Sequence, residues 1–417
     1  MAAAMDRPAA AAYARRGSGR GPRPPWAVRA RRAGREAGPG RLMNIEVRAD
    51  PRVRAPVLEV PNLPYTEGNP YQRLLYADPA GRIRPVAWRH AWHRLARAHR
   101  RGALPVVHLH WDDRIFGRGA DPAANRAEAE ALLGHLGRYR EAGGRLLWTI
   151  HNRRPHREID AQTFAAARAR LATMADAIHV HAPHAAAHMR EAWQAPAERL
   201  HVLPHPSYLG AYEPEIDTLA RPLPAAAERR FLFFGMFRGQ KGVSRIAEAA
   251  DKLARRGHRF RLEMAGRAFA SQRRLLARLA ANPAIELFPE RVPDEQVAPV
   301  FARNQLFLFP NHDVFTSGSV MLALTFGLPV IGPRVPALVE TLPEGNRALL
   351  YDPESPRGLI RAMRDAIEME DAELARLRAE ALAFARERAP RVIGRRMADL
   401  ILTLAQGDPA HGPRQSV

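Results

Sequence analysis

The sequence predicts an α/β protein made of two doubly wound, Rossmann-like domains. Three observations support this: the chain has 417 residues, 46% of them are hydrophobic, and short apolar runs alternate with helical stretches through two successive halves. A chain of this length is expected to form two domains, or three at most. Strands that alternate with helices favour a parallel sheet with helices on both faces.

The first 42 residues differ in composition from the rest. They hold ten Arg against Asp6 and Glu36, which accounts for +8 of the formal net charge of +21. They show neither apolar periodicity nor a secretory apolar core, so we expect residues 1–42 to be a disordered, Arg-rich leader. The stretch faintly resembles a transit peptide, but we interpret it as a start assigned too far upstream, with the folded protein beginning at Met43.

Residues 43–208 are predicted to form the first domain. Its predicted strands are the apolar runs at 55–63, 104–111, 145–150, 177–182 and 200–205. Its predicted helices are 122–142, 160–175 and 183–193. A Pro-rich stretch without a clear period follows, and residues 209–229 are predicted to be the linker between domains.

The alternation restarts in residues 230–390, the second predicted domain. Its predicted strands are 230–237, 259–266, 284–289, 305–310 and 328–333, and its predicted helices are 242–256, 269–281, 292–304, 318–326 and 356–390. The acidic run at 368–373 reads as a solvated helix face, and residues 391–417 as a C-terminal helix and tail. Ligands of such sheets lie beyond the carboxyl ends of the strands, so we expect the two domains to face each other across a cleft.

Composition excludes several classes of protein. No run of 18 apolar residues is present, so we expect no membrane-spanning helix. The absence of Cys excludes disulfides, thiolate chemistry and Cys-based metal sites, and it fits a reducing cytoplasm. The +13 outside the leader favours anionic partners, namely nucleotide phosphates, anionic lipid surfaces or nucleic acid.

A loop in the second half carries an unusual lysine. Lys241 and Lys252 are the only lysines among 64 Lys and Arg residues. Arg238 and Lys241 follow an apolar run, at the predicted carboxyl end of a strand and just before a helix. An ammonium on a flexible stem can bind a phosphate as a point charge. The loop is therefore predicted to bind a diphosphate, with a solvated loop as the alternative.

A second loop precedes the predicted helix at 318–326. It contains Thr316, Ser317, Gly318 and Ser319. Backbone N–H groups at a helix start, together with hydroxyls, form a suitable anion site. An ordinary N-cap is the alternative, because Ser and Thr are preferred capping residues. Its predicted position near the basic loop favours a joint phosphate site.

Residues 230–340 resemble the C-terminal domain of GT-B-fold glycosyltransferases of the family-4-like (glycosyl transferases group 1) type. The matching stretches are "FFGMFRGQKGV", "RLEMAG", "IELFPERVPDEQVAPVFARNQLFLFP" and "TSGSVMLALTFGLPVIGP", followed by "PALVE". The resemblance implies a GT-B fold and a nucleoside-diphosphate sugar as co-substrate, with no other cofactor. It implies that Arg238 and Lys241 bind the donor diphosphate, and that Gly235 and Glu340 contact the donor.

The sequence departs from this family at two positions. The family's pair of glutamates, eight residues apart, would fall near Val314 and Leu322, which leaves the ribose contact and the stereochemical course open. The "TSGS" loop resembles that of bacterial exopolysaccharide enzymes, including β-mannosyltransferase-like ones. This resemblance makes GDP-mannose the first expected donor and a UDP-sugar the second.

The first half offers candidates for the chemistry. His110, His151, His181 and His205 lie at or just beyond the predicted carboxyl ends of strands. The segments "HLHWDD" (108–113) and "LLWTIHNRRPHRE" (146–158) resemble stretches of the same bacterial glycosyltransferases, and "NPYQRLLY" resembles their first helix.

An inverting transferase needs a base near the acceptor hydroxyl, and histidine suits that role because its ordinary pKa lies near neutrality. We expect His151 to be this base, with Asp112 or Asp113 second. If the enzyme retains configuration, His151 would contact the donor instead. Candidate donor or acceptor contacts in this half are His110, Asn152 and His156.

The sequence therefore predicts a metal-independent glycosyltransferase that acts on a glycan or a lipid-linked acceptor. A basic chain of this kind could work in the cytoplasm and dock on the anionic inner face of the membrane. A catalytically inactive GT-B module that binds nucleotide or glycan is the main alternative. A nucleic-acid-binding protein is a weaker one, because aromatic residues make up only 7% and no known motif is present.

Overall fold

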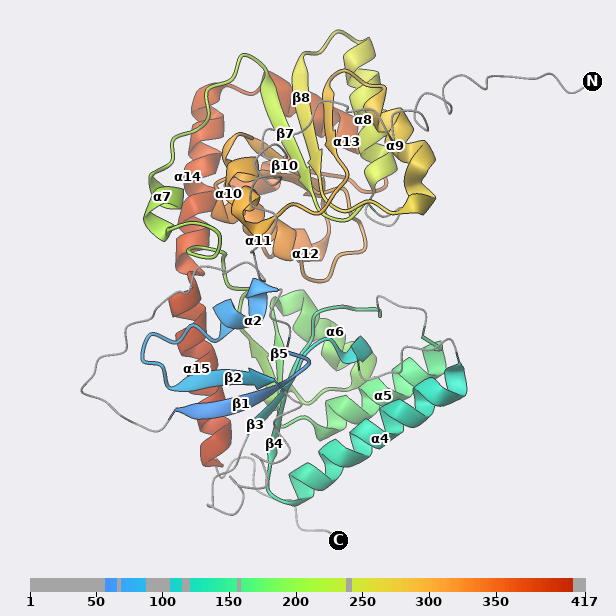
Figure 1. Cartoon of the computed structure of the whole chain (residues 1–417), viewed down its shortest axis with the longest axis vertical. Coiled ribbons are helices and arrows are strands. Elements are labelled where there is room, and N and C mark those ends of the chain that lie inside the picture. The colour runs from blue at the N-terminus through green and yellow to red at the C-terminus, as the bar shows by residue number, and fades with distance from the viewer. Residues whose placement is uncertain are drawn as a thin grey trace, which may run out of the picture.

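The computed structural model describes residues 57–65, 69–87, 106–114, 121–155, 159–237 and 242–407. These residues form two α/β domains, one above the other in Figure 1, each built on a six-stranded parallel sheet. Helix α14 (Asp371–Glu387) runs beside the second domain and α15 (Pro390–Gln406) beside the first. The predicted class, α/β with two doubly wound domains, is confirmed.

The first sheet has the strand order β2-β1-β3-β4-β5-β6. Its strands are β1 (Leu58–Leu63), β2 (Ile83–Ala87), β3 (Val106–Leu109), β4 (Arg145–Thr149), β5 (Ala177–Val180) and β6 (Leu200–Val202). The helices of this domain are α2 (Pro70–Leu75), α4 (Pro122–Glu141), α5 (Ala161–Met174) and α6 (Pro183–Trp193). Sequence analysis missed β2, because "IRPVA" is an edge strand that is only partly buried and contains a proline.

Side-chain caps explain where two of these helices begin. Asp121 accepts a hydrogen bond from the Ala123 N–H at the start of α4, and Asp160 accepts one from the Thr163 N–H at the start of α5. Pro122 occupies the first turn of α4, where its missing N–H costs nothing. These caps satisfy N–H groups that would otherwise lack a partner within the helix and so favour helix starts at these positions.

The second sheet has the strand order β12-β11-β10-β7-β8-β9. Its strands are β7 (Arg229–Phe234), β8 (Phe260–Ala265), β9 (Ile285–Phe288), β10 (Leu306–Leu308), β11 (Val330–Pro333) and β12 (Leu350–Tyr351). Its helices are α8 (Val243–Arg255), α9 (Arg273–Ala280), α10 (Asp294–Ala302), α11 (Gly318–Thr325), α12 (Pro336–Val339) and α13 (Gly358–Glu368). A short helix, α7 (Glu215–Ala220), lies within the predicted linker.

The helical stretch predicted over 356–390 is confirmed for most of its length, but it consists of two helices. Met369 and Glu370 have extended backbone and separate α13 from α14. The acidic run at 368–373 therefore spans a helix break instead of a solvated helix face. Asp371 and Glu373 lie in the first turn of α14, where negative charge is favourable because the N-terminal end of a helix carries partial positive charge.

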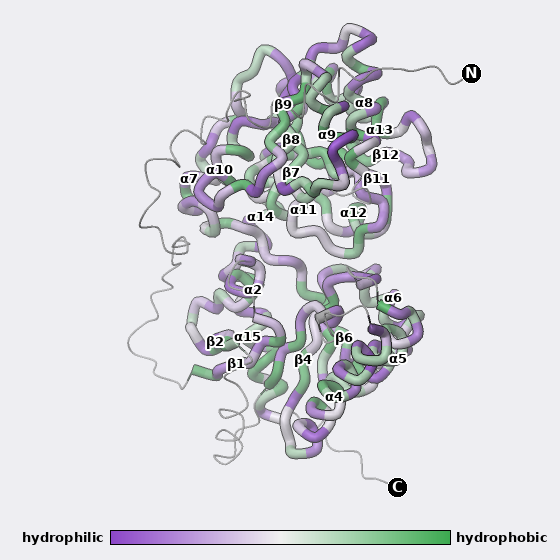
Figure 2. The backbone as a smooth tube through the Cα atoms, turned by 45° about the vertical axis from the view of Figure 1, so that its right-hand side comes forward, coloured by the Kyte–Doolittle hydropathy of each residue, from purple (hydrophilic) through white to green (hydrophobic). Residues whose placement is uncertain are grey.

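The central strands of both sheets are buried on both faces, as parallel sheets usually are. Figure 2 shows the hydrophobic segments at the centre of each domain, with hydrophilic segments on the outer helices. In the first domain, Ile393 and Met397 of α15 pack in one cluster with Val60 of β1 and Tyr71 of α2. Helix α15 therefore completes the core of the first domain.

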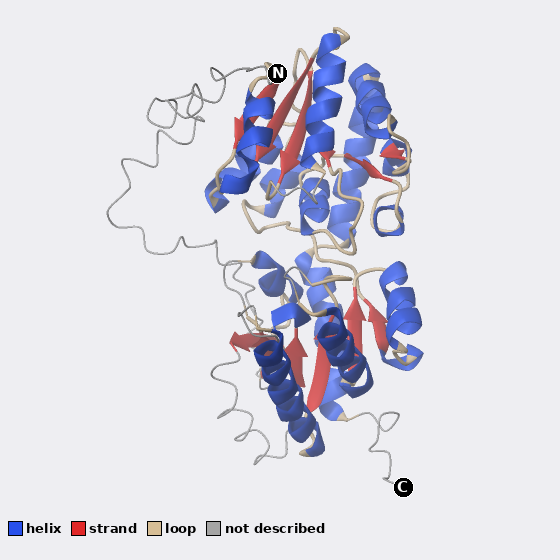
Figure 3. Ribbon diagram, turned by 90° about the vertical axis from the view of Figure 1, so that its right-hand side faces the viewer, coloured by secondary structure: helices blue, strands red, loops and turns tan. Residues whose placement is uncertain are grey.

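The carboxyl ends of the strands lie at the junction between the domains. In Figure 3 most strand arrows of the two sheets point toward this junction. The loops that follow the strands of one sheet thus meet those of the other. Across the described part of the chain, no helix is both long and apolar enough to cross a membrane.

Candidate active site

A group of histidines lies at the carboxyl ends of the first sheet, and the ring of Tyr71 lies among them. The distances from the Tyr71 ring centroid are 6.1 Å to His110, 5.0 Å to His151, 5.5 Å to His181 and 4.8 Å to His205. The Tyr71 hydroxyl lies 3.0 Å from Nε2 of His181. The structure thus brings together the four histidines that the sequence placed at strand ends. Sequence analysis missed Tyr71, although it lies directly after Pro70 in the matched "NPYQRLLY" stretch.

His151 is held from three sides. Its Nε2 lies 3.1 Å from Nδ1 of His110. The Trp111 ring stacks on it at a centroid distance of 4.5 Å and an interplanar angle of 16°, and Tyr71 meets it edge-on. Trp111 has a φ of 41°, a left-handed conformation that costs about 1–3 kcal/mol outside glycine. Such strain persists where the surroundings fix the backbone, and functional sites are a common place for it.

Burial makes His110 and His181 weak bases, together with His108 and His179, which lie beside them. It lowers the pKa of His108, His110 and His181 well below the ordinary value, and that of His179 to about 4. The cause is desolvation, which disfavours the charged imidazolium. At neutral pH these rings are therefore neutral, with one nitrogen protonated and the other accepting.

Asp112 is bound by a buried arginine. Nε and Nη2 of Arg168 donate to its two oxygens at 2.6 and 3.1 Å. The same guanidinium also donates to the backbone carbonyls of Asn152 and Arg153, in the loop that follows His151. A carboxylate held at both oxygens by one guanidinium is a weak candidate for a general base. Asp112 thus connects the segment after β3 to this loop, and His151 remains the first candidate for the base. Asp113, the neighbour of Asp112, is also buried.

The start of α11 lies directly against the first domain. Ser317 caps the helix, its Oγ accepting from the Val320 N–H at 3.3 Å and lying 3.1 Å from Oγ of Ser319. A Cβ added at Gly318 would lie 2.7 Å from the Tyr208 hydroxyl and 3.7 Å from Nε2 of His205. The predicted anion site, which Thr316 precedes, is thus adjacent to the histidine group.

Glu340 joins the two domains. Its Oε2 accepts from the backbone N–H of His184, in the first turn of α6, at 2.7 Å and lies 2.7 Å from Nδ1 of the same residue. Nε2 of His184 lies 3.0 Å from the carbonyl oxygen of Phe315. Phe315 in turn packs into the core cluster of the first domain. The predicted donor contact Glu340 therefore belongs to the domain junction.

Three predicted site residues, Arg238, Lys241 and His156, lie outside the described residues. The described flanks of the basic loop are Phe237, which is buried, and Gly242, which caps α8. Gly242 has a φ of 70°, and an added Cβ would lie 2.5 Å from the Pro310 carbonyl oxygen, so this position requires glycine.

Gly235 follows β7 at the same sheet edge. It has a φ of 149°, a conformation that favours glycine. A Cβ added at Gly266 would lie 2.0 Å from the Gly235 carbonyl oxygen, so the backbones that leave β7 and β8 are in close contact. Within the described ranges, no group of three or more His, Asp or Glu side chains is arranged to hold a metal ion.

Residues 228–369 match the family described as glycosyl transferases group 1. We call this part of the chain the group 1 domain. The group 1 domain contains the whole second sheet and ends where α13 ends. The resemblance predicted over 230–340 is thereby confirmed at the level of the family.

The two-domain architecture around the group 1 domain resembles several solved structures. A glycosyltransferase from Rickettsia africae is 11% identical with a TM-score of 0.57, covering 84% of this chain and 99% of its own. HepE from Anabaena in complex with UDP-glucose is 14% identical with a TM-score of 0.60, covering 83% of this chain and 100% of its own. WaaG, a glycosyltransferase involved in lipopolysaccharide biosynthesis, is 15% identical with a TM-score of 0.51, covering 83% and 99%. These likenesses show the GT-B fold. Among curated proteins, none matches this chain.

Proposed function

We propose that this protein is a glycosyltransferase that moves a sugar from a nucleoside-diphosphate sugar to a hydroxyl of a glycan or lipid-linked acceptor. One observation carries the proposal. The start of α11, in the group 1 domain, lies next to Tyr208 and His205 and so next to the histidine group of the other domain. A helix start can bind the anionic donor, and a buried histidine group beside it can position and deprotonate an acceptor.

The second domain is proposed to bind the donor. Arg238 and Lys241 would hold the diphosphate, together with the N–H groups and hydroxyls at Thr316–Ser319. These groups would also stabilise the charge that develops on the leaving diphosphate, without a metal ion. HepE was solved with UDP-glucose, which supports a nucleotide-sugar donor. We propose GDP-mannose and UDP-sugars as the donors to compare first.

The first domain is proposed to bind the acceptor, with His151 as the base of an inverting reaction. The net charge of +13 outside residues 1–42 suits an acceptor at an anionic surface, so peripheral contact with the cytoplasmic face of a membrane belongs to this proposal. Asn152 and His156 follow His151 in the chain and would contact the acceptor.

Ligand-dependent melting of the full chain tests the donor site. GDP, UDP, ADP and their sugar conjugates are compared on wild type, Lys241→Ala and Lys252→Ala. Lys252 is the matched control, because it is the other lysine and forms an exposed ion pair with Glu248 on α8. A nucleotide at about 100 times its dissociation constant adds about 2.7 kcal/mol, or roughly 5–10 °C in melting temperature.

We expect one nucleotide family to raise the melting temperature of wild type and Lys252→Ala, and to have little effect on Lys241→Ala. If no nucleotide shifts the wild type, the donor site is refuted. An equal shift in Lys241→Ala would refute the role of Lys241 alone.

A catalytically inactive nucleotide-binding module is the second candidate. It is favoured by the apolar residues at the two family glutamate positions, Val314 and Leu322, of which Leu322 is buried in the core of the second domain. A melting shift without sugar transfer to any acceptor, or to water, would favour this candidate over an enzyme.

A further inference from the structure

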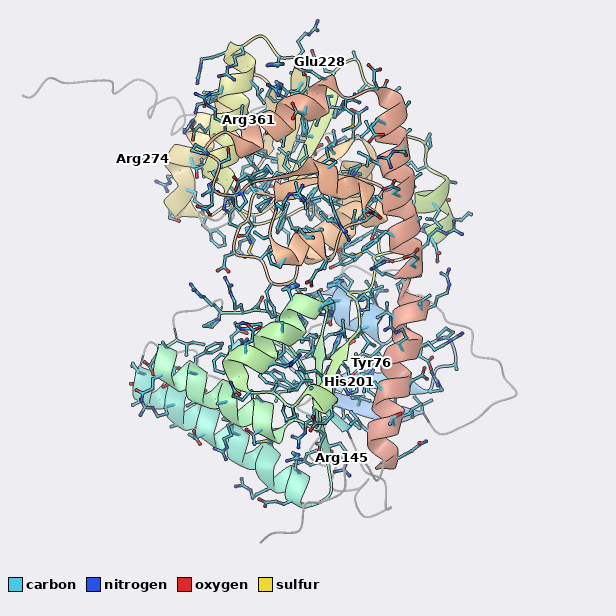
Figure 4. The ribbon with its side chains drawn as sticks, turned by 180° about the vertical axis from the view of Figure 1, so that it is seen from behind. Tyr76, Arg145, His201, Glu228, Arg274 and Arg361 are labelled. Carbon is cyan, nitrogen blue, oxygen red and sulfur yellow. The ribbon has the colours of Figure 1, made fainter. Side chains whose placement is uncertain are left out.

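A series of hydrogen bonds runs beside the histidine group and starts at a backbone carbonyl. Nε2 of His179 lies 2.9 Å from the carbonyl oxygen of Leu203, and Nδ1 of His179 lies 2.9 Å from Oγ1 of Thr149. Thr149 Oγ1 lies 2.6 Å from Nε2 of His108, and Nδ1 of His108 lies 2.7 Å from the Tyr76 hydroxyl. Tyr76, labelled in Figure 4, belongs to the first domain. This series of hydrogen bonds thus crosses the sheet from the residue after β6 to the end of α2.

The donor and the acceptor of each hydrogen bond in this series follow from the first bond. A carbonyl oxygen only accepts, so Nε2 of His179 donates to Leu203 and Nδ1 of the neutral ring accepts from Thr149. The Thr149 hydroxyl has then donated its proton, so it accepts from Nε2 of His108. Nδ1 of His108 must then accept from Tyr76, whose oxygen accepts the next bond. That bond comes from Nδ2 of Asn62, at 3.0 Å.

A second, independent set of bonds fixes the same orientation of Asn62. Its Nδ2 also donates to the carbonyl of Val60 at 3.0 Å, and a carbonyl cannot donate in return. Its Oδ1 therefore accepts, from Nε2 of Gln72 at 3.0 Å and from Nε2 of His110 at 2.9 Å. Nδ1 of the neutral His110 ring is left to accept from Nε2 of His151.

We propose that Asn62 is a positioning residue that acts through His110 to hold His151 in its Nε2-protonated tautomer, with the lone pair on Nδ1. The inference rests on the proposed function in that His151 is taken as the base. In the reaction the acceptor oxygen bonds to the anomeric carbon while the bond from that carbon to the diphosphate oxygen breaks. The diphosphate keeps that electron pair, and the acceptor proton moves to Nδ1 of His151. A His151 ring protonated on Nδ1 could not accept this proton.

The packing around His151 preserves this arrangement. Trp111 stacks on one face of the ring and Tyr71 meets it edge-on, so rotation of the ring is hindered. The side chain of Asn62 is fully buried, and protein groups bond to both atoms of its amide. The tautomer is thus set by the fold before any substrate binds, which is the arrangement a preorganised base needs.

The ring nitrogens can be observed directly in the full chain labelled with ¹⁵N-histidine. Long-range proton–nitrogen correlation spectra distinguish the two neutral tautomers, and the signals of His151 are identified by their loss in His151→Gln. We expect Nε2 of both His110 and His151 to carry the proton in the wild type. A wild-type His151 protonated on Nδ1 would overturn the inference without any further variant.

Asn62→Leu and Tyr76→Phe form a matched pair of variants. Both remove buried polar atoms of the same network, but only Asn62→Leu removes the acceptor for Nε2 of His110. We expect Asn62→Leu to shift His151 toward the Nδ1-protonated tautomer, and Tyr76→Phe to leave it unchanged because Val60 and Gln72 still orient Asn62. An unchanged His151 spectrum in a folded Asn62→Leu protein would overturn the inference.

Turnover then separates this inference from the proposed function. With the donor identified, we expect Asn62→Leu to lower kcat by roughly 10–100-fold with the KM for donor unchanged. If the wild type transfers no sugar but shows the expected tautomer and its loss in Asn62→Leu, the proposed function fails and the positioning role of Asn62 stands. If transfer occurs and Asn62→Leu alters the tautomer without lowering kcat, the base role of His151 is refuted.

Discussion

Arg168 is the buried cation whose loss should cost the first domain most. Its side chain is 1% exposed and pairs with Asp112, which is 4% exposed. Arg168→Met keeps much of the packing against Phe164 and Trp193 but removes the donors to Asp112 and to two backbone carbonyls. The carboxylate of Asp112 would remain buried without its partner, in the loop next to His151.

The structure sets the expected size of this effect. Removing one partner of a buried ion pair costs about 3–5 kcal/mol, because the remaining charge is left desolvated. Arg170, on the same helix, pairs with Glu130 in an ion pair whose side chains are 44% and 55% exposed. Loss of such a surface pair costs about 0.2–1 kcal/mol, so Arg170→Met is the matched control.

Urea unfolding followed by tryptophan fluorescence measures the difference. All six tryptophans precede residue 209, so the signal reports the amino-terminal half of the chain. With a slope of about 1–3 kcal/mol per molar urea, a loss of about 3–5 kcal/mol in Arg168→Met should lower the midpoint by roughly 1–5 M. A shift no larger than that of Arg170→Met would refute the reasoning that this buried pair holds the His151 loop.

Three further outcomes follow from the same structure. First, the folded pKa values of His108, His110 and His181 lie below the unfolded value of about 6.5, and that of His179 is about 4, so the unfolded chain takes up more protons as pH falls. The urea midpoint of the first domain should therefore decrease from pH 6.5 toward pH 4, and a midpoint that stays constant over this window would contradict the prediction. Second, Gln194 ends α6 with a φ of 52°, a conformation that glycine adopts more easily. Gln194→Gly should therefore raise the free energy of unfolding, measured by tryptophan fluorescence, by about 1 kcal/mol. A decrease would show that the Gln194 side chain contributes more than its backbone strain costs. Third, a Cβ at residue 318 would lie 2.7 Å from the Tyr208 hydroxyl, so Gly318→Ala should lower the free energy of thermal unfolding by about 1–3 kcal/mol. Adding Tyr208→Phe should restore most of this loss, and no recovery in the double variant would show that the strain lies elsewhere.

Much of the fold could be read from the sequence. Apolar runs such as "LPVVHLHW" and "RFLFFGMF" predict buried strands, because a parallel sheet covered on both faces needs side chains that are apolar throughout. The helix start at Ser317 was also visible, since capping depends on residues only a few positions apart. The missed strand β2 and the break at Met369 lack such local signals. Pairing with a neighbouring strand decides the first, and packing of two separate helices decides the second.

The sequence by itself determined which residues lie at the strand ends, and so it named His110, His151, His181 and His205 together. It also identified the group 1 domain, because the order and spacing of its motifs are local properties of the chain. It could not show that Asn62, on β1, orients His110, since the two lie 48 positions apart and meet only when β1 pairs with β3. Nor could it show that Asp112 belongs to Arg168 on α5, or that Glu340 bonds to His184 across the domains. Hydrogen bonds and ion pairs of this kind depend on separations of a few ångströms between distant segments, and only the tertiary structure decides those separations.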